Sequence, residues 1–150
     1  MTGSIETIET IVHARGHANV SGTHASTLEV TSEAFLTPAG DCIVAVGADP
    51  TPADFPEAFR AACRSHEARI TLALEVHDTT SDRVHTETVS GRGHSDLTLA
   101  DDTSMVIRTS DYVDDRTVMV SAEKAAGDLD RGLVEALAAG ADLRVVLRVE

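Results

Sequence analysis

The chain has little positive charge. Lysine and arginine together account for 12 of its 150 residues, against 25 aspartates and glutamates, and the formal net charge is −13. Proteins that bind the nucleic-acid backbone in general need a basic face, so this balance excludes a general binder of that kind. Concentrated salt screens repulsion between like charges, and the acid excess therefore indicates a salt-rich cell interior.

Cysteines, aromatic residues and long apolar runs are also scarce. Cys42 and Cys63 are too few for a disulfide framework or a four-cysteine metal site, and we expect both to be reduced and buried. No run reaches the roughly 18 apolar residues of a membrane-spanning helix, so no membrane partner is expected. The first four residues lack the basic and apolar regions of a signal peptide, which favours a cytoplasmic protein. We expect one domain, residues 1–150, because this length is too short for two ordinary domains, and we expect it to fold because 42% of the residues are apolar.

An internal repeat organises the sequence. Arg15-Gly16-His17 recurs as Arg92-Gly93-His94, and the similarity continues in the same order through later segments of each half. The two units are expected at about 5–77 and 82–150, each read as three strands, a helix and a strand. The sequence therefore predicts an α+β fold of two duplicated strand-strand-strand-helix-strand units, with an antiparallel or mixed sheet and two helices.

Local patterns place the ends of the helices and the buried face of the sheet. Asp54 and Glu57 have the spacing of a capping box at the first helix, while Asp128 is the expected cap of the second and Gly140 its end. Apolar residues alternate over 70–76 and 143–149, which indicates strands with one buried face. We expect the helices to cover that face and water to contact the other.

Three early segments, 14–20 (ARGHANV), 23–31 (THASTLEVT) and 36–43 (LTPAGDCI), carry a resemblance to a known family. Together with the later segment 116–131, they resemble the archaeal domain of unknown function family 371 over nearly the whole chain. The resemblance implies an archaeal, single-domain, cytosolic protein, and with the acid excess a haloarchaeal member. It implies no activity. Ala25 and Ser26 depart from the family pattern, where a basic residue and a threonine are expected.

Polar residues are concentrated in the segment that follows the first Arg-Gly-His corner. The candidate catalytic residues are His17, His24, Glu29 and Asp41. Histidine changes charge near neutral pH and carboxylates can orient it, so this set has the chemistry of a hydrolase or transferase. The alternative is that both histidines are structural and form hydrogen bonds at strand ends.

The same hypothesis includes a ligand and a metal. A small anionic or metal-linked ligand would contact Arg15, Asn19, Thr27, Thr37, Arg92 and Lys124. A divalent metal would be held by His17, His24 and His94 if the two units face each other across a pseudo-two-fold axis. The alternatives are that Arg-Gly-His only turns the chain, and that Lys124 is a surface residue or forms a local ion pair.

A second class of function stays open. Arg108, Arg116 and Arg131 could form a local patch on a non-catalytic module that serves translation, RNA handling or protein assembly. A closed polar pocket would favour chemistry, whereas a flat arginine-lined face would favour an RNA or protein partner. The sequence does not predict the oligomeric state.

Overall fold

The computed structural model describes residues 7–150. The expected start of the first unit near residue 5 lies outside the described residues. So do the first four residues, on which the expectation of no signal peptide was based.

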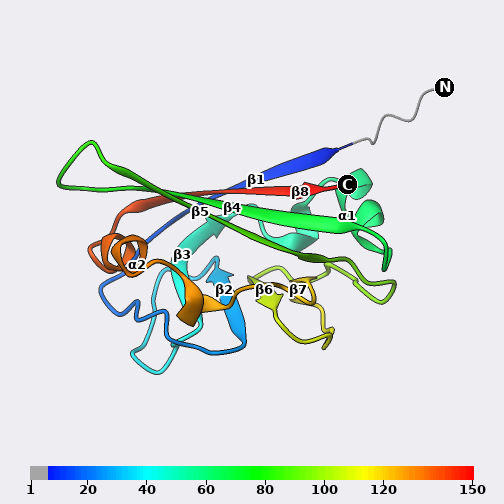
Figure 1. The fold of residues 1–150 in the computed structure, drawn as a ribbon, viewed down its shortest axis with the longest axis horizontal. Coiled ribbons are helices and arrows are strands. Elements are labelled where there is room, and N and C mark those ends of the chain that lie inside the picture. The colour runs from blue at the N-terminus through cyan, green and yellow to red at the C-terminus, as the bar shows by residue number, and fades with distance from the viewer. Residues whose placement is uncertain (1–6) are drawn as a thin grey trace.

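Residues 7–150 form eight strands and four short helices (Figure 1). The strands are β1 (Ile8–Arg15), β2 (Thr27–Thr31), β3 (Ile43–Asp49), β4 (Arg69–His77), β5 (Val84–Arg92), β6 (Ser104–Arg108), β7 (Thr117–Met119) and β8 (Asp142–Val149). The α-helices are α1 (Glu57–Cys63) and α2 (Arg131–Ala138), and each follows a single 3-10 turn, η1 (Pro52–Asp54) and η2 (Ala126–Asp128). The α+β class is confirmed.

All eight strands belong to one mixed sheet in the order β5-β4-β8-β1-β3-β2-β6-β7. The pairs β2–β3 and β6–β7 are parallel, and the other pairs are antiparallel. The two ends of this order meet, because Arg92 at the end of β5 forms an isolated antiparallel bridge with Val120 just after β7. Both hydrogen bonds of that bridge are made, at 2.8 and 2.9 Å. The sheet therefore closes on itself.

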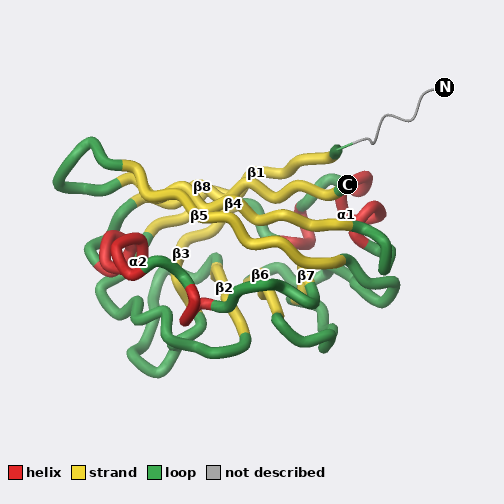
Figure 2. The backbone as a smooth tube through the Cα atoms, viewed as in Figure 1, coloured by secondary structure: helices red, strands yellow, loops and turns green. Residues whose placement is uncertain are grey.

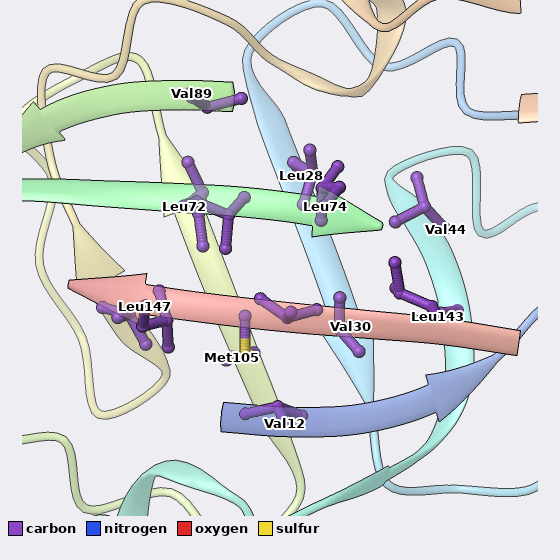
Figure 3. Close-up of a cluster of buried hydrophobic side chains, with 14 of the residues drawn as sticks. Val12, Leu28, Val30, Val44, Leu72, Leu74, Val89, Met105, Leu143 and Leu147 are labelled. Carbon is purple, nitrogen blue, oxygen red and sulfur yellow. The ribbon is translucent and has the colours of Figure 1, made fainter. Parts of the chain in front are cut away.

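The closed sheet is flattened into two layers, with β5, β4, β8 and β1 in one and β3, β2, β6 and β7 in the other (Figure 2). Alternate side chains of each strand point between the layers, where Leu72 and Leu147 of one layer meet Leu28 and Met105 of the other (Figure 3). This apolar filling stabilises the fold by removing hydrocarbon from water.

The expectation that helices cover the sheet is wrong. The second layer of the same sheet covers the buried face, and α1 and α2 lie at opposite ends of the core (Figure 1). The helices are too short to cover a face: α1 has seven residues and α2 has eight. None of the helices in the described part of the chain is long and apolar enough to cross a membrane.

The helix starts also differ from the prediction. Asp54 and Asp128 end the 3-10 turns, where they accept hydrogen bonds from Thr51 Oγ1 and Ala125 N. Helix α1 begins after Pro56, whose ring has no atom that accepts a hydrogen bond, and the carboxylate of Asp130 caps α2. The end of α2 before Gly140, which has a φ of +92°, is as predicted.

The two halves contain the same elements in the same order: three strands, a 3-10 turn, a helix and a strand. Details also correspond. Arg15 pairs with Val46 as Arg92 pairs with Val120, and the next residues, Gly47 and Ser121, both have positive φ values, of 66° and 51°. An origin by duplication stays a prediction.

Candidate functional site

Each Arg-Gly-His corner packs against the last turn of the helix in the other half. A Cβ atom at Gly16 would collide with the carbonyl oxygen of Leu137 in α2, and one at Gly93 would collide with that of Cys63 in α1. The glycines are needed for this close approach of two backbones. Because α1 and α2 lie at opposite ends of the core, the two corners are far apart.

The histidines at these corners act as acceptors for nearby backbone amides. The Nδ1 atoms of His17 and His94 accept the N–H two residues further along, each at 3.0 Å. His24 Nδ1 accepts from Thr27 N at 3.1 Å and lies 3.0 Å from Thr27 Oγ1. A neutral imidazole with Nδ1 as acceptor carries its proton on Nε2, so we infer that each ring presents a donor there.

The structure does not bring His17, His24 and His94 together as a metal site. His17 and His94 are at opposite ends of the molecule, and residues 7–150 contain no group of three or more histidines, cysteines or carboxylates positioned to hold a metal. The expected convergence fails because the corners pack on helices, not on each other.

Part of the predicted catalytic set gathers around Cys42. Glu29 and Thr27 lie on β2, and Cys42 Sγ donates a long hydrogen bond of 3.8 Å to Glu29 Oε1. The main chain of Asp41 accepts from the amides of Thr23 and His24. His17 is not part of this group, because its loop is joined instead through Asn19 Nδ2 to the carbonyl of Leu36, at 2.7 Å.

The two thiols are held in their neutral forms. Burial, and then the charge of Glu29, raise the pKa of Cys42 above its usual value, although a hydrogen bond with Thr27 opposes them. Burial raises the pKa of Cys63 to about 12. Since the thiolate is the nucleophilic form, neither cysteine is prepared for nucleophilic attack.

All three guanidinium groups of the predicted arginine patch already have partners within the chain. Arg108 donates to Thr117 Oγ1 at 2.8 Å and to Asp114 at 3.0 Å. Arg116 pairs with the same carboxylate at 3.0 Å and lies 3.8 Å from Glu29. Arg131 donates to backbone carbonyls, including those of residues 22, 126 and 129, and ties the β1–β2 loop to α2.

Asp114 predicts a dependence of stability on acid pH. Burial opposes its ionisation, but hydrogen bonds from Arg116 and Thr117 outweigh that and lower its pKa from 3.8 to about 2. A carboxyl with a lowered folded-state pKa contributes stability above its ordinary pKa and loses it as the pH falls toward 2. Asp114→Asn should therefore cost about 1 kcal/mol of unfolding free energy at neutral pH, and almost nothing near pH 2.

Urea unfolding at several pH values measures this. The exposed Asp82, changed to asparagine, is the matched control and should leave the slope between pH 4 and pH 2 intact. An Asp114→Asn protein that retained the full slope would show that another carboxyl is responsible.

The remaining predicted ligand residues are dispersed. Lys124 forms an ion pair with Glu87 at 3.0 Å, which is the local pairing considered as the alternative. Thr37 is exposed in the loop before β3, and the guanidinium of Arg15 lies over Gly47. No pocket is found among residues 7–150.

The second corner has basic neighbours that the sequence analysis missed. In the register of β4 and β5, Arg69 lies directly opposite Arg92, and both are exposed. The imidazole of His66 packs edge-on against that of His94, with ring centroids 4.3 Å apart, and His66 Nε2 lies 3.0 Å from Ser95 Oγ. We call Arg69, Arg92, His66, His94 and Ser95 the basic corner; it lies at the end of the molecule that bears α1 (Figure 1).

The first corner has the opposite electrostatic character. Its arginine, Arg15, lies opposite Asp142 in the register of β1 and β8. The same position of the fold thus holds a pair of unlike charges at one end and two arginines at the other. No carboxylate of residues 7–150 lies within ion-pair distance of Arg69 or Arg92.

Comparison with known proteins identifies the family of this fold. The family described as Domain of unknown function (DUF371) matches residues 12–150, which include both corners and all eight strands except the start of β1. The chain belongs to DUF371. A relative from the archaeon Methanocaldococcus jannaschii, titled "Uncharacterized protein MJ0206", is 42% identical over 136 residues, which cover 91% of this chain and 96% of the relative. The resemblance based on the early segments is therefore confirmed, and every candidate residue lies within the DUF371 match.

Proposed function

We propose that this protein binds the phosphate or carboxylate group of a small anionic ligand at the basic corner. The observation that carries the proposal is the direct opposition of Arg69 and Arg92 on neighbouring strands. Like charges in that position destabilise a sheet, and an anion between them removes the repulsion. Guanidinium groups also bind phosphate and carboxylate through two parallel hydrogen bonds.

The histidines favour an anion over a metal at the same place. His94 Nδ1 is used by the amide of Asp96, so its Nε2–H is free to donate. The hydroxyl of Ser95 is a further donor beside His66. Guanidinium, imidazole and hydroxyl groups are donors that recognise oxyanions, and the basic corner contains all three.

The net negative charge of the whole chain opposes the binding of anions. At −13 overall, the protein repels anions at long range, so a ligand must be held by contacts made at the corner itself. We infer from the acid excess that the protein works in a cytoplasm of high salt, where the long-range repulsion is screened. Binding should then be easier to detect as salt is raised from low values with a poorly coordinating salt.

Isothermal titration calorimetry with inorganic phosphate and with citrate tests the proposal. Removal of one charge-assisted contact costs about 1.5–3 kcal/mol, so Arg69→Ala and Arg92→Ala should each weaken binding at least about tenfold. Arg15→Ala is the matched control, because Arg15 holds the equivalent position at the first corner, opposite Asp142.

Perturbation of backbone amide signals in nuclear magnetic resonance spectra locates the site. The amides of Gly93 and His94 should shift on titration, and those of Gly16 and His17 should not. The proposal would be overturned if neither phosphate nor citrate bound, or if Arg15→Ala weakened binding as much as Arg69→Ala and Arg92→Ala do.

A further inference from the structure

One face of the sheet is uncovered. The outward-facing residues of β1, β8, β4 and β5 are every second residue of 9–15, 142–148, 69–77 and 84–92, and we call this surface the open face. Neither helix and no loop of residues 7–150 lies over it in Figures 1 and 2. The open face spans the four neighbouring strands of the wider layer of the molecule.

The open face differs in charge from the rest of the protein. Its arginines are Arg15, Arg69, Arg92, Arg144 and Arg148. Its carboxylates are Glu9, Glu75 and Asp142. Basic residues thus exceed acidic ones here, although in the whole chain acidic residues outnumber them 25 to 12. When two copies approach, the mutual repulsion is smallest if these faces meet.

The middle of the open face is apolar. Ile11, Val146 and Ala73 are consecutive register partners across β1, β8 and β4. Val146 is only 7% exposed, yet it is not a member of the core between the layers, because it points the other way. Ion pairs flank this row on both sides: Arg144 with Glu75 at 3.0 Å, and Arg148 with Glu9. An apolar centre with a polar rim is the usual anatomy of a protein interface.

The charges of the open face are also complementary to those of a second copy. Consider a two-fold axis that runs along the strands between β8 and β4. It places each residue of β8 over the partner copy's residue of β4 from the same register row. Val146 then meets Ala73, and Arg144 meets Glu75, in both directions. The result is a small apolar patch beside four alternating charges.

We propose that the open face is the interface of a homodimer, with a second copy of this chain packed on it sheet to sheet. The apolar row and the ion pairs that carry this inference do not include Arg69 and Arg92, although both arginines lie on the open face and contribute to its excess of basic residues. Higher salt should strengthen the dimer, since salt screens the repulsion between two chains of −13.

Sedimentation velocity over a range of protein concentrations and salt tests the dimer. Glu75→Arg leaves two arginines facing two arginines, and Arg144→Glu leaves two carboxylates facing two, so each variant alone should be a monomer. Mixed together, the two variants restore opposite charges at every contact and should form a heterodimer. Neither substitution touches the core, so both variants should fold.

Glu135→Arg on the exposed side of α2 is the matched control and should dimerise as the unmodified chain does. Two outcomes would overturn the inference. One is an unmodified chain that stays monomeric at every concentration and salt tested. The other is a dimer that both single variants retain.

Discussion

Replacement of Gly93 by alanine is expected to destabilise the protein by about 3 kcal/mol. The added methyl group would collide with the carbonyl oxygen of Cys63, lie 2.6 Å from that of Ser65, and lie 3.1 Å from the Ala68 side chain. Two of the three obstacles are backbone atoms, which cannot rotate away as a side chain can. Either β5 must separate from the end of α1 or the bond between His94 N and Cys63 O, now 3.1 Å, must break. Urea unfolding followed by circular dichroism measures the loss.

The fold supplies both a replicate and a control for this result. Gly16→Ala should be similarly costly, because the methyl group would meet the main chain of Leu137. Gly132→Ala lies inside α2, where the atom in the way is the end of the Asp130 side chain at 3.0 Å, and alanine favours helix. That variant should be neutral or slightly more stable. Equal stability of Gly93→Ala and Gly132→Ala would refute the account of the corners as backbone-to-backbone contacts.

Phe59→Ala is expected to cost about 3–5 kcal/mol, the range for loss of a large aromatic side chain from a core. Phe59 on α1 is 0% exposed and meets Phe55 edge-to-face, with ring centroids 5.6 Å apart. These two rings fill one end of the space between the layers, and the short helix that carries Phe59 cannot move inward to refill it. The midpoint temperature of thermal unfolding should fall sharply, so that Phe59→Ala stays folded only at low temperature.

Phe35→Ala provides the comparison, because that ring is 64% exposed in the loop before β3. Its removal should change the unfolding free energy by less than about 0.5 kcal/mol. A result in which both phenylalanines mattered equally would contradict the assignment of the core.

Much of the fold could be predicted because local sequence patterns determine where its strands and helices lie. The alternation in 143–149 identified β8 to within one residue, and Gly140 marked the end of the preceding helix. The caps were misplaced because Asp54 and Asp128 satisfy the same local spacing in a 3-10 turn as they would in an α-helix. The distinction depends on the residues that follow, Pro56 in one half and Asp130 in the other.

The covering of the sheet could not be predicted, because it depends on contacts between distant segments. Leu28 and Leu72 look alike as alternating strand residues, and nothing local says that their strands lie in opposite layers. A sheet that curls far enough to pack on itself does not need helices to cover its buried face. Helices α1 and α2 lie at the ends of the core instead.

The candidate site shows the same limit. Arg92 and His94 were found from their repeated motif, but Arg69 and His66 belong to no motif and meet them only through the register of β4 and β5. One signal was present in the sequence: at positions that correspond between the halves, Asp142 follows the second helix where Arg69 follows the first. A comparison of differences between the repeats, in place of their identities, would have drawn attention to it.

The bridge between Arg92 and Val120 has a consequence for the behaviour of the protein at high salt concentration. Salt that screens an acidic coat also allows protein molecules to approach, and an unpaired strand edge then invites other chains to add to it. Here the backbone groups of Arg92 are occupied by Val120, and Ser90 next to it bonds the main chain and the carboxylate of Glu123. These bonds protect the end of β5 that holds Ser90 and Arg92 against the addition of strands from other molecules. In the proposed dimer, association uses the open face instead, and a two-fold axis limits the assembly to two copies.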